Sequence, residues 1–239
     1  MRNSAIALVL AALTSFLSLP AAAVPFTDGQ MYSFSQNTWG ASPAVSPPAK
    51  LVQDHFDSLY PGGLIVGGTN YIQLTSAGPV LDYLPQTGPA AALNAILIDP
   101  TSSSSGIFGG QVTGLALNIA FSDAGYTLGS LGIPFGDLLF HDLTGNVAGL
   151  NGDNFRQFLD LTELALGGGN AGYSIADLST LIMQVNGGFE GGFTSTYAQD
   201  HFALPAVQPS SVPEPSALLL FATALLLMEC SRRRVRIDK

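Results

Sequence analysis

The chain has 239 residues, of which 47% are hydrophobic and only 10% are charged. Between residues 24 and 212, two basic residues, Lys50 and Arg156, stand against 14 acidic ones, which gives this stretch a formal charge of −12. A protein face that binds nucleic acid or anionic lipid headgroups needs many more cations than this. Both are therefore excluded as partners of this stretch. The one cysteine, Cys230, lies near the C-terminus, so the preceding residues have no disulfide, thiolate metal site or cysteine nucleophile.

Residues 1–23 have the composition of a signal peptide. Arg2 supplies a positive start, an apolar run extends from Ala5 to Leu19, and Ala21 and Ala23 are small residues at the positions that signal peptidase reads. We expect cleavage before Val24. The alternative, an N-terminal membrane anchor, is disfavoured because the run is short for a span.

The first half of the domain at 24–202 predicts a mixture of short strands and helices. A strand is expected near Met31 to Phe34, and three prolines predict a loop from Ala41 to Pro48. Apolar residues on one face predict a helix over Leu51 to Tyr60. Two strands, Leu64 to Val66 and Tyr71 to Thr75, are expected to form a hairpin around a glycine-rich turn.

The second half predicts mainly helices. Residues 107–121 fit both a strand period and a helix period, and the length of the apolar run favours a helix. A helix is predicted within Gly152 to Leu166, capped by Asn151 or Asp153. Another begins after Ser174, which forms a capping-box-like pair with Asp177 and leads into a run ending near Val185. We expect these last two helices to form a hairpin. The fold class predicted is therefore α+β, mainly helical, with a small β-hairpin or sheet.

Candidates for catalysis are weak. His55, His141 and His201 have no metal-ligand spacing and are read as ordinary surface histidines. Fourteen carboxylates allow a glycosidase-like pair, but pairs arise easily by chance in such a set. Neither a nucleophile elbow nor a phosphate loop occurs, since Gly129-Ser130-Leu131-Gly132 has the wrong spacing for an elbow. We predict no enzymatic activity and no cofactor.

Two binding chemistries remain open. Oxygen donors that could hold calcium gather in one glycine-rich stretch, although their spacing does not fit an EF-hand loop and solvated turn residues account for them better: Asp142, Thr144, Asn146, Asn151 and Asp153. Aromatic rings could stack on sugars or fill the core: Trp39 and the tyrosines at 32, 60, 71, 83, 126, 173 and 197.

The C-terminal part has a distinct order of segments. A Pro/Ser linker at 203–211 leads to Val212, Pro213, Glu214 and Pro215, and the apolar residues 216–230 follow. As a helix, that apolar segment would be roughly 22 Å long, short of the roughly 30 Å hydrocarbon core. The basic cluster that follows should stay cytoplasmic and place everything upstream outside: Arg232, Arg233, Arg234 and Arg236. The cluster also excludes a buried core helix, because few acidic partners lie nearby.

The ordered motif, apolar span and arginine cluster at 212–239 resemble the PEP-CTERM sorting signal. The resemblance implies recognition and cleavage by an exosortase in a Gram-negative host that makes exopolysaccharide. A looser resemblance, to an uncharacterised module of bacterial surface proteins, depends on three groups of residues. These are Phe34-Ser35-Gln36-Asn37-Thr38-Trp39-Gly40, Phe56 with Pro61-Gly62-Gly63, and Gly110-Gln111 with Leu117-Asn118 and Phe121-Ser122-Asp123-Ala124-Gly125.

Together these features predict an exported protein, anchored in the inner membrane through its C-terminal helix before processing and then located at the cell surface or outside the cell. The leading hypothesis is a non-enzymatic surface or extracellular-matrix protein associated with exopolysaccharide or biofilm. A carbohydrate-binding module, with or without calcium, is the alternative. An exported hydrolase using carboxylates is a third hypothesis, which no sequence feature favours.

Overall fold

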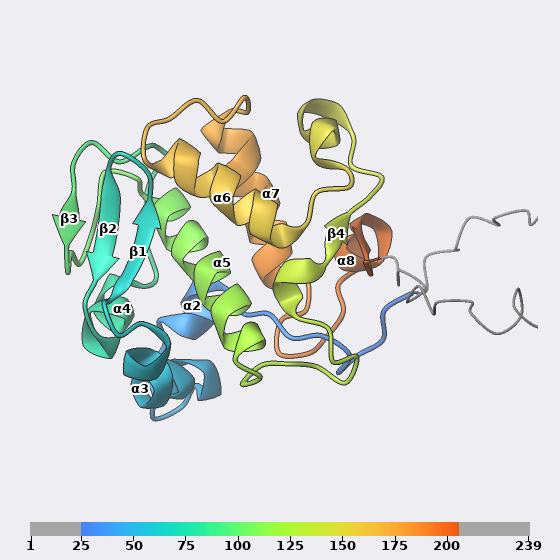
Figure 1. The fold of residues 1–239 in the computed structure, drawn as a ribbon, viewed down its shortest axis with the longest axis horizontal. Helices are drawn as coiled ribbons and strands as arrows, with labels where there is room; N and C mark the ends of the chain where they lie inside the picture. Colours follow the sequence, from blue (N-terminus) through green and yellow to red (C-terminus); the bar gives the residue numbers. More distant parts are fainter. Residues whose placement is uncertain (1–24, 206–239) are drawn as a thin grey trace, which may run out of the picture. The chain divides into compact units, whose positions relative to one another are not determined.

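The computed structural model describes residues 25–205 (Figure 1). The predicted signal peptide with its cleavage positions Ala21 and Ala23, most of the linker, the sorting motif, the membrane span and the arginine cluster all lie outside these residues.

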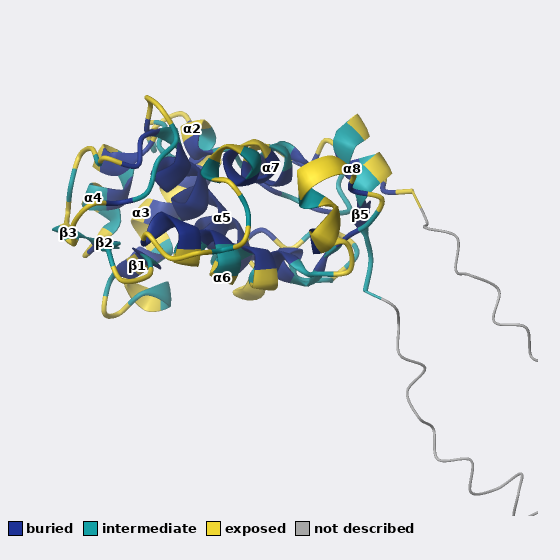
Figure 2. Cartoon of the chain, turned by 90° about the horizontal axis from the view of Figure 1, so that it is seen from above, coloured by how far each residue is buried: buried dark blue, intermediate teal, exposed yellow. Residues whose placement is uncertain are grey.

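Helix α5 (Ile107–Asp123) is the centre of the fold. It lies between α7 (Ile175–Gly187) and α6 (Phe155–Leu166), and Figure 2 shows it buried along most of its length. The prediction of a helix over 107–121 is therefore confirmed. Because α5 is covered on several sides, apolar residues occur all around it, and this is why its sequence fits two periods.

The predicted helices after residue 150 are confirmed, with a corrected start for the first. Asn154, rather than Asn151 or Asp153, caps α6: its side chain accepts from the backbone N–H of Gln157, and Gln157 accepts in return from the N–H of Asn154. This is a complete capping box. Ser174 caps α7 as predicted. We expected these two helices to form a helical hairpin, and this is wrong. Helices α6 and α7 pack mainly against α5 rather than against each other.

The N-terminal segment differs more from expectation. Met31 to Phe34 is not a strand; it forms a single parallel bridge between Ser33 and Glu190. A short helix that the sequence did not predict, α2 (Gln36–Trp39), follows. Helix α3 (Pro47–Leu59) begins inside the predicted loop. Prolines are tolerated in the first turn of a helix, where their missing N–H groups would have no partner.

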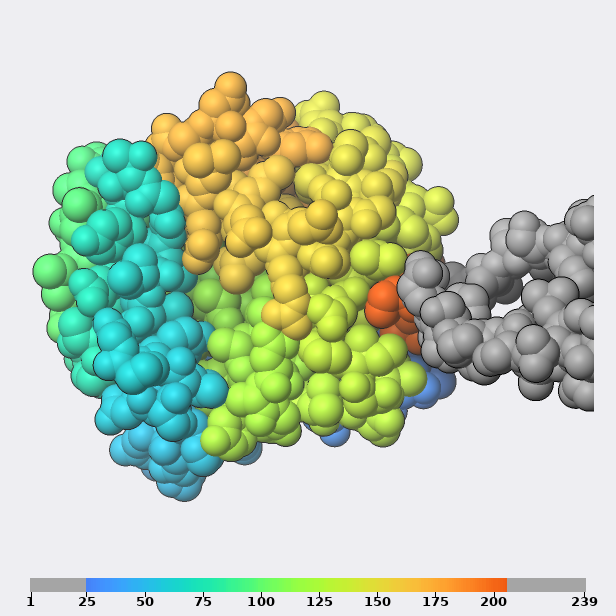
Figure 3. Space-filling view, viewed as in Figure 1, coloured from blue at the N-terminus to red at the C-terminus, as the bar shows by residue number. Residues whose placement is uncertain are grey.

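The predicted hairpin is confirmed and forms part of a three-stranded sheet. Strands β1 (Leu64–Gly67) and β2 (Tyr71–Leu74) are antiparallel. Helix α4 (Ala77–Tyr83) follows, and β3 (Leu97–Ile98) pairs in parallel with β2. One face of the sheet is buried against the helices, and Figure 3 shows the strands forming one end of the described part of the chain.

Both ends of the described chain lie at the opposite end of the fold (Figure 1). The 3-10 turns η1 (Phe135–Asp137) and η2 (Gly145–Leu150) flank strand β4 (Leu139–Phe140). Strand β4 pairs with β5 (Phe202–Ala203), which follows α8 (Thr196–His201). The Thr194 N–H donates to Asp28 at 2.9 Å, and the side chain of Gln199 in α8 donates to the Phe26 carbonyl, so the first and last described segments are joined directly.

The α+β class is thus confirmed, with helices dominating and the strands confined to two small sheets. Among residues 25–205, no helix is both long and apolar enough to cross a membrane.

Candidate binding groove

A surface hollow with a volume of about 490 Å³ is the strongest candidate site within the described residues, and we call it the groove. Four separate segments form it: the chain around α2, the start of α3, the loop after α5, and the turn after α7. Its lining is mainly apolar and aromatic, with a few polar groups: Tyr32, Phe34, Thr38, Pro47, Pro48, Leu51, Tyr126, Thr127, Leu128, Glu190 and Gly191. This size and composition are typical of small-ligand sites.

Phe34 is held in the groove by Asn118 of α5. The Asn118 side chain accepts from the Phe34 N–H at 2.8 Å and donates to the Phe34 carbonyl at 2.9 Å. Asn118 Oδ1 also accepts from the indole N–H of Trp39 at 3.1 Å, and the Trp39 ring meets Phe34 edge-on at 5.4 Å. The backbone and the ring of Phe34 are therefore both fixed.

The other two aromatic rings of the groove are also supported. His55 of α3 stacks on Tyr126, with ring centroids 4.0 Å apart and an interplanar angle of 19°. Gly192, at φ +92°, lies so close to Tyr32 that a Cβ there would be 2.6 Å from the tyrosine ring. Rings fixed before a ligand arrives lose little conformational entropy on binding.

Glu190 is the one formally charged residue in the groove lining. Its Oε1 accepts from the Thr38 hydroxyl at 2.5 Å, and its Oε2 accepts from the Ser35 N–H at 2.7 Å. Two donors from α2 and its cap therefore hold the carboxylate in place at the edge of the apolar surface.

Thr127 is the second notable polar residue of the lining. It is 7% exposed, and its hydroxyl has no hydrogen-bond partner among the described residues. An unsatisfied hydroxyl is costly in a folded protein unless a ligand or water completes it.

A buried polar network lies behind the groove. Asn118 donates to Asn186 Oδ1 at 3.0 Å, and Asn186 donates to the carbonyl of Gln111 at 2.9 Å. The Gln111 side chain in turn accepts from Ser179 at 2.7 Å. Trp39, Gln111 and Asn118 are residues of the looser surface-module resemblance. Gln111 and Asn118 both lie on α5, and Trp39, 79 residues before Asn118, is brought against that helix by its indole hydrogen bond.

The predicted calcium donors do not converge on one point. The Asn151 amide binds both the N–H and the carbonyl of Leu143, at 2.8 and 2.9 Å. Asn146 donates to Asp177 at 3.1 Å, beside a small polar hollow that Thr144 also lines. Asp142 instead contacts His141 at 3.1 Å. No group of three or more acidic, histidine or cysteine side chains that could hold a metal occurs within 25–205.

Two of the three histidines, His141 and His201, are joined through their backbones, and in the described part of the chain their side chains form no shared site. The His141 N–H donates to the His201 carbonyl at 3.0 Å, next to the β4–β5 pair. The side chain of His141 contacts Asp142 and the Phe202 carbonyl, whereas His201 Nδ1 has no partner among the described residues. His55 lies elsewhere, against Tyr126 of the groove.

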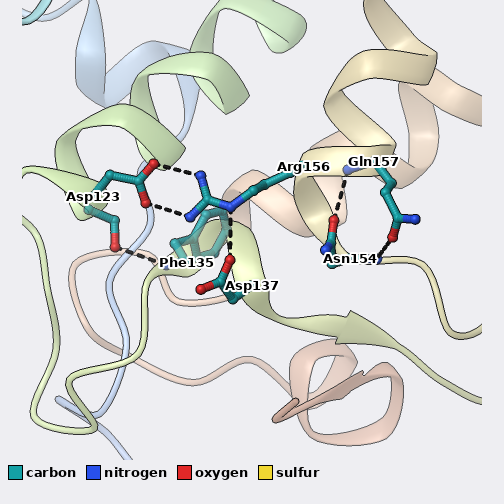
Figure 4. A network of polar contacts seen from close by, with 7 residues as sticks. Asp123, Phe135, Asp137, Asn154, Arg156 and Gln157 are labelled. Atoms are coloured by element: carbon teal, nitrogen blue, oxygen red, sulfur yellow. Dashed lines mark hydrogen bonds and ion pairs between the residues drawn. The ribbon is translucent and has the colours of Figure 1, made fainter.

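Two groups of carboxylates outside the groove have notable surroundings. Arg156 pairs with both oxygens of Asp123 at 2.6 Å and with Asp137 at 2.8 Å, so it joins the end of α5 to η1 and α6 (Figure 4). Glu163 of α6 differs, because burial and the nearby charge of Asp160 raise its pKa to about 7. Neither cluster lines the groove.

Sequence reasoning found some of the groove and missed the rest. Tyr32 and Tyr126 were among the candidate sugar-stacking residues and line it, whereas Trp39 and Tyr83 are core residues with no exposed surface. Glu190 and Thr127 were missed, because nothing local in the sequence marks them. Phe34 could have been found from its place in the aromatic motif before Trp39.

No protein-family model matches the chain, and neither a curated protein nor a solved structure shows significant similarity to it.

Proposed function

We propose that the chain is an exported surface or extracellular-matrix protein that an exosortase sorts and cleaves, and that it acts with exopolysaccharide or in a biofilm without being an enzyme. The observation that carries this proposal is the order of segments in the tail. Pro213, Glu214 and Pro215 precede an apolar run, and the arginine cluster from Arg232 to Arg236 follows it. The signal peptide at 1–23 and the membrane helix at 216–230 belong to the same proposal.

The arrangement of the described chain supports a tethered domain. Its first and last segments meet at one end of the fold, while the three-stranded sheet lies at the other (Figure 1). A domain held through one end in this way leaves most of its surface free for contacts with the matrix.

The test is the fate of the full chain in an exopolysaccharide-producing Gram-negative host with an exosortase. We expect an intact mass that begins at Val24 and lacks the basic cluster, from protein found outside the cytoplasm. Replacing Glu214 by Ala, or all four clustered arginines by Gln, should leave unprocessed protein. A matched change of Gln208 to Ala in the linker should have no effect. A mature chain in the cytoplasm, or processing unchanged in both tail variants, would refute the proposal.

The groove favours carbohydrate binding as a second function. Three supported aromatic rings beside a fixed carboxylate present the stacking surfaces and hydrogen-bonding groups that a sugar chain requires. A glycan array with and without chelator would test this. We expect retained glycans that are lost in Tyr126→Ala and kept in Phe193→Ala, a control at an exposed aromatic residue that does not line the groove. Loss of binding on chelation would add calcium to the proposal.

A further inference from the structure

We infer that the ligand of the groove is a cationic amino-sugar polymer, a polysaccharide of hexosamine units with free ammonium groups. This inference rests on the proposed carbohydrate binding and adds the charge class of the ligand. It depends on the relation between the Glu190 carboxylate and the aromatic rings of the groove.

Among the described residues, no lysine or arginine lines the groove, whose one formally charged residue is Glu190. Lys50 pairs with Asp54 at 3.0 Å, and Arg156 is engaged by Asp123 and Asp137. These are the only two basic residues between 24 and 212. A uronate or sulfated chain would meet net negative charge without a counter-charge, so the domain should repel it.

Glu190 can accept further hydrogen bonds. A carboxylate offers about four acceptor positions, and the donors Thr38 and Ser35 occupy one on each oxygen. The carboxylate is thus fixed in place, lines the groove and keeps acceptor capacity that a ligand can use. A protonated amine is the sugar substituent that gains most from such a partner, because charge-assisted hydrogen bonds are roughly twice as strong as neutral ones.

The aromatic lining also suits an ammonium group. Tyrosine and phenylalanine rings attract cations over their faces, and rings that surround a site are a recurrent means of ammonium recognition. Tyr32, Phe34 and Tyr126 line the same groove as Glu190. Apolar faces suit the carbon side of a sugar ring, and the carboxylate suits its ammonium group, so one hexosamine unit can use both.

The experiment uses mature protein purified from the exporting host and three hexasaccharides: glucosamine, N-acetylglucosamine and a uronate. Isothermal titration is run at a pH where the sugar amines are protonated. We expect the glucosamine hexamer to bind at least tenfold more tightly than the N-acetylated one, and the uronate hexamer to show no binding.

Matched variants separate specific recognition from general attraction of a polycation to an acidic protein. Glu190→Gln should abolish the tenfold preference. Asp57→Asn removes the same charge from an exposed position outside the groove and should preserve it. If Glu190→Gln does not fold, Tyr126→Leu should weaken binding of the glucosamine hexamer about tenfold, whereas Phe193→Leu should leave it unchanged.

The outcomes distinguish the two proposals. Equal binding of the acetylated hexamer, binding of the uronate, or equal effects of Glu190→Gln and Asp57→Asn would overturn the cationic ligand and leave carbohydrate binding standing. If all three hexamers fail to bind while the glycan array retains other sugars, only the charge class is wrong. If the array is also blank, both proposals fail.

Discussion

Asn118, in the middle of α5, hydrogen-bonds to both backbone polar groups of Phe34, at 2.8 Å to the N–H and 2.9 Å to the carbonyl. Its side chain thereby satisfies both backbone groups of a residue that follows the single bridge at Ser33 and belongs to no strand. The same amide accepts from the Trp39 indole and donates to Asn186. One side chain therefore fixes the groove's Phe34 and the core's Trp39 together.

Asn118→Ala should destabilise the domain by about 2–4 kcal/mol, because it leaves several buried polar groups without partners. Urea unfolding monitored by tryptophan fluorescence would measure the loss, and Trp39 is the chain's one tryptophan. Asn146→Ala is the matched control. It removes an exposed amide whose side-chain hydrogen bond is with Asp177, and we expect a change within about 0.5 kcal/mol. Equal losses in both variants would contradict the role given to Asn118.

Much of the fold follows from local sequence signals, and the exceptions have physical causes. The hairpin of β1 and β2 and the cap of α7 were predictable, because turn glycines and Ser174 act on their immediate neighbours. The start of α3 was not predicted, because prolines were read as breakers although Pro47 and Pro48 occupy a first turn. The covering of α5 by both α6 and α7 depends on long-range packing that no local pattern encodes.

The groove was less predictable than the fold. Its lining comes from segments near residues 34, 48, 126 and 190, and only the tertiary structure brings them together. Tyr32 and Tyr126 could be proposed from residue type alone. Glu190 could not, because its importance arises from donors at Ser35 and Thr38, more than 150 residues earlier.

Asn154→Ala should cost about 1 kcal/mol of stability, because it removes the capping box that satisfies the first N–H groups of α6. Asp153→Ala is the matched control, because alanine would remove any cap that the aspartate provides. The sequence offered Asp153 as a cap, but the structure gives it no capping role, so its change should stay within about 0.5 kcal/mol. Thermal and urea unfolding of the two variants would decide, and a larger loss at Asp153 would show that α6 begins one residue earlier.

Arg156→Ala should destabilise the domain by about 1–2 kcal/mol, more than an ordinary surface pair, because its guanidinium binds Asp123 with two nitrogens and Asp137 with a third. Lys50→Ala, which breaks a single exposed pair with Asp54, should cost less than about 0.5 kcal/mol. Urea unfolding at low and high salt would show the Arg156 effect shrinking with ionic strength. A loss independent of salt would instead assign it to packing of the arginine stem on Gly136.

Glu163 should make the folded domain less stable as the pH rises from about 4.5 to about 7. Burial, assisted by Asp160, raises its pKa to about 7 from an ordinary 4.5, so the folded state keeps a proton that the unfolded state has lost. Stability is therefore full below the unfolded pKa and declines through the folded pKa. Because Glu163 is partly exposed, we expect a decline of about 1–2 kcal/mol, roughly half of what a fully buried group would give.

Urea unfolding between pH 4.5 and 8.5 would measure this decline against the background of the other titrating groups. Glu163→Gln should remove about 1–2 kcal/mol of the pH dependence and stabilise the domain at pH 8 by a similar amount, because a neutral amide replaces a charge that burial disfavours. Asp160→Asn should lower the midpoint of the decline, since it removes the second cause of the shift. Asp200→Asn, at an exposed site, should leave the profile unchanged. If Glu163→Gln had the same pH profile as the unaltered protein, the titrating group would have to be sought elsewhere.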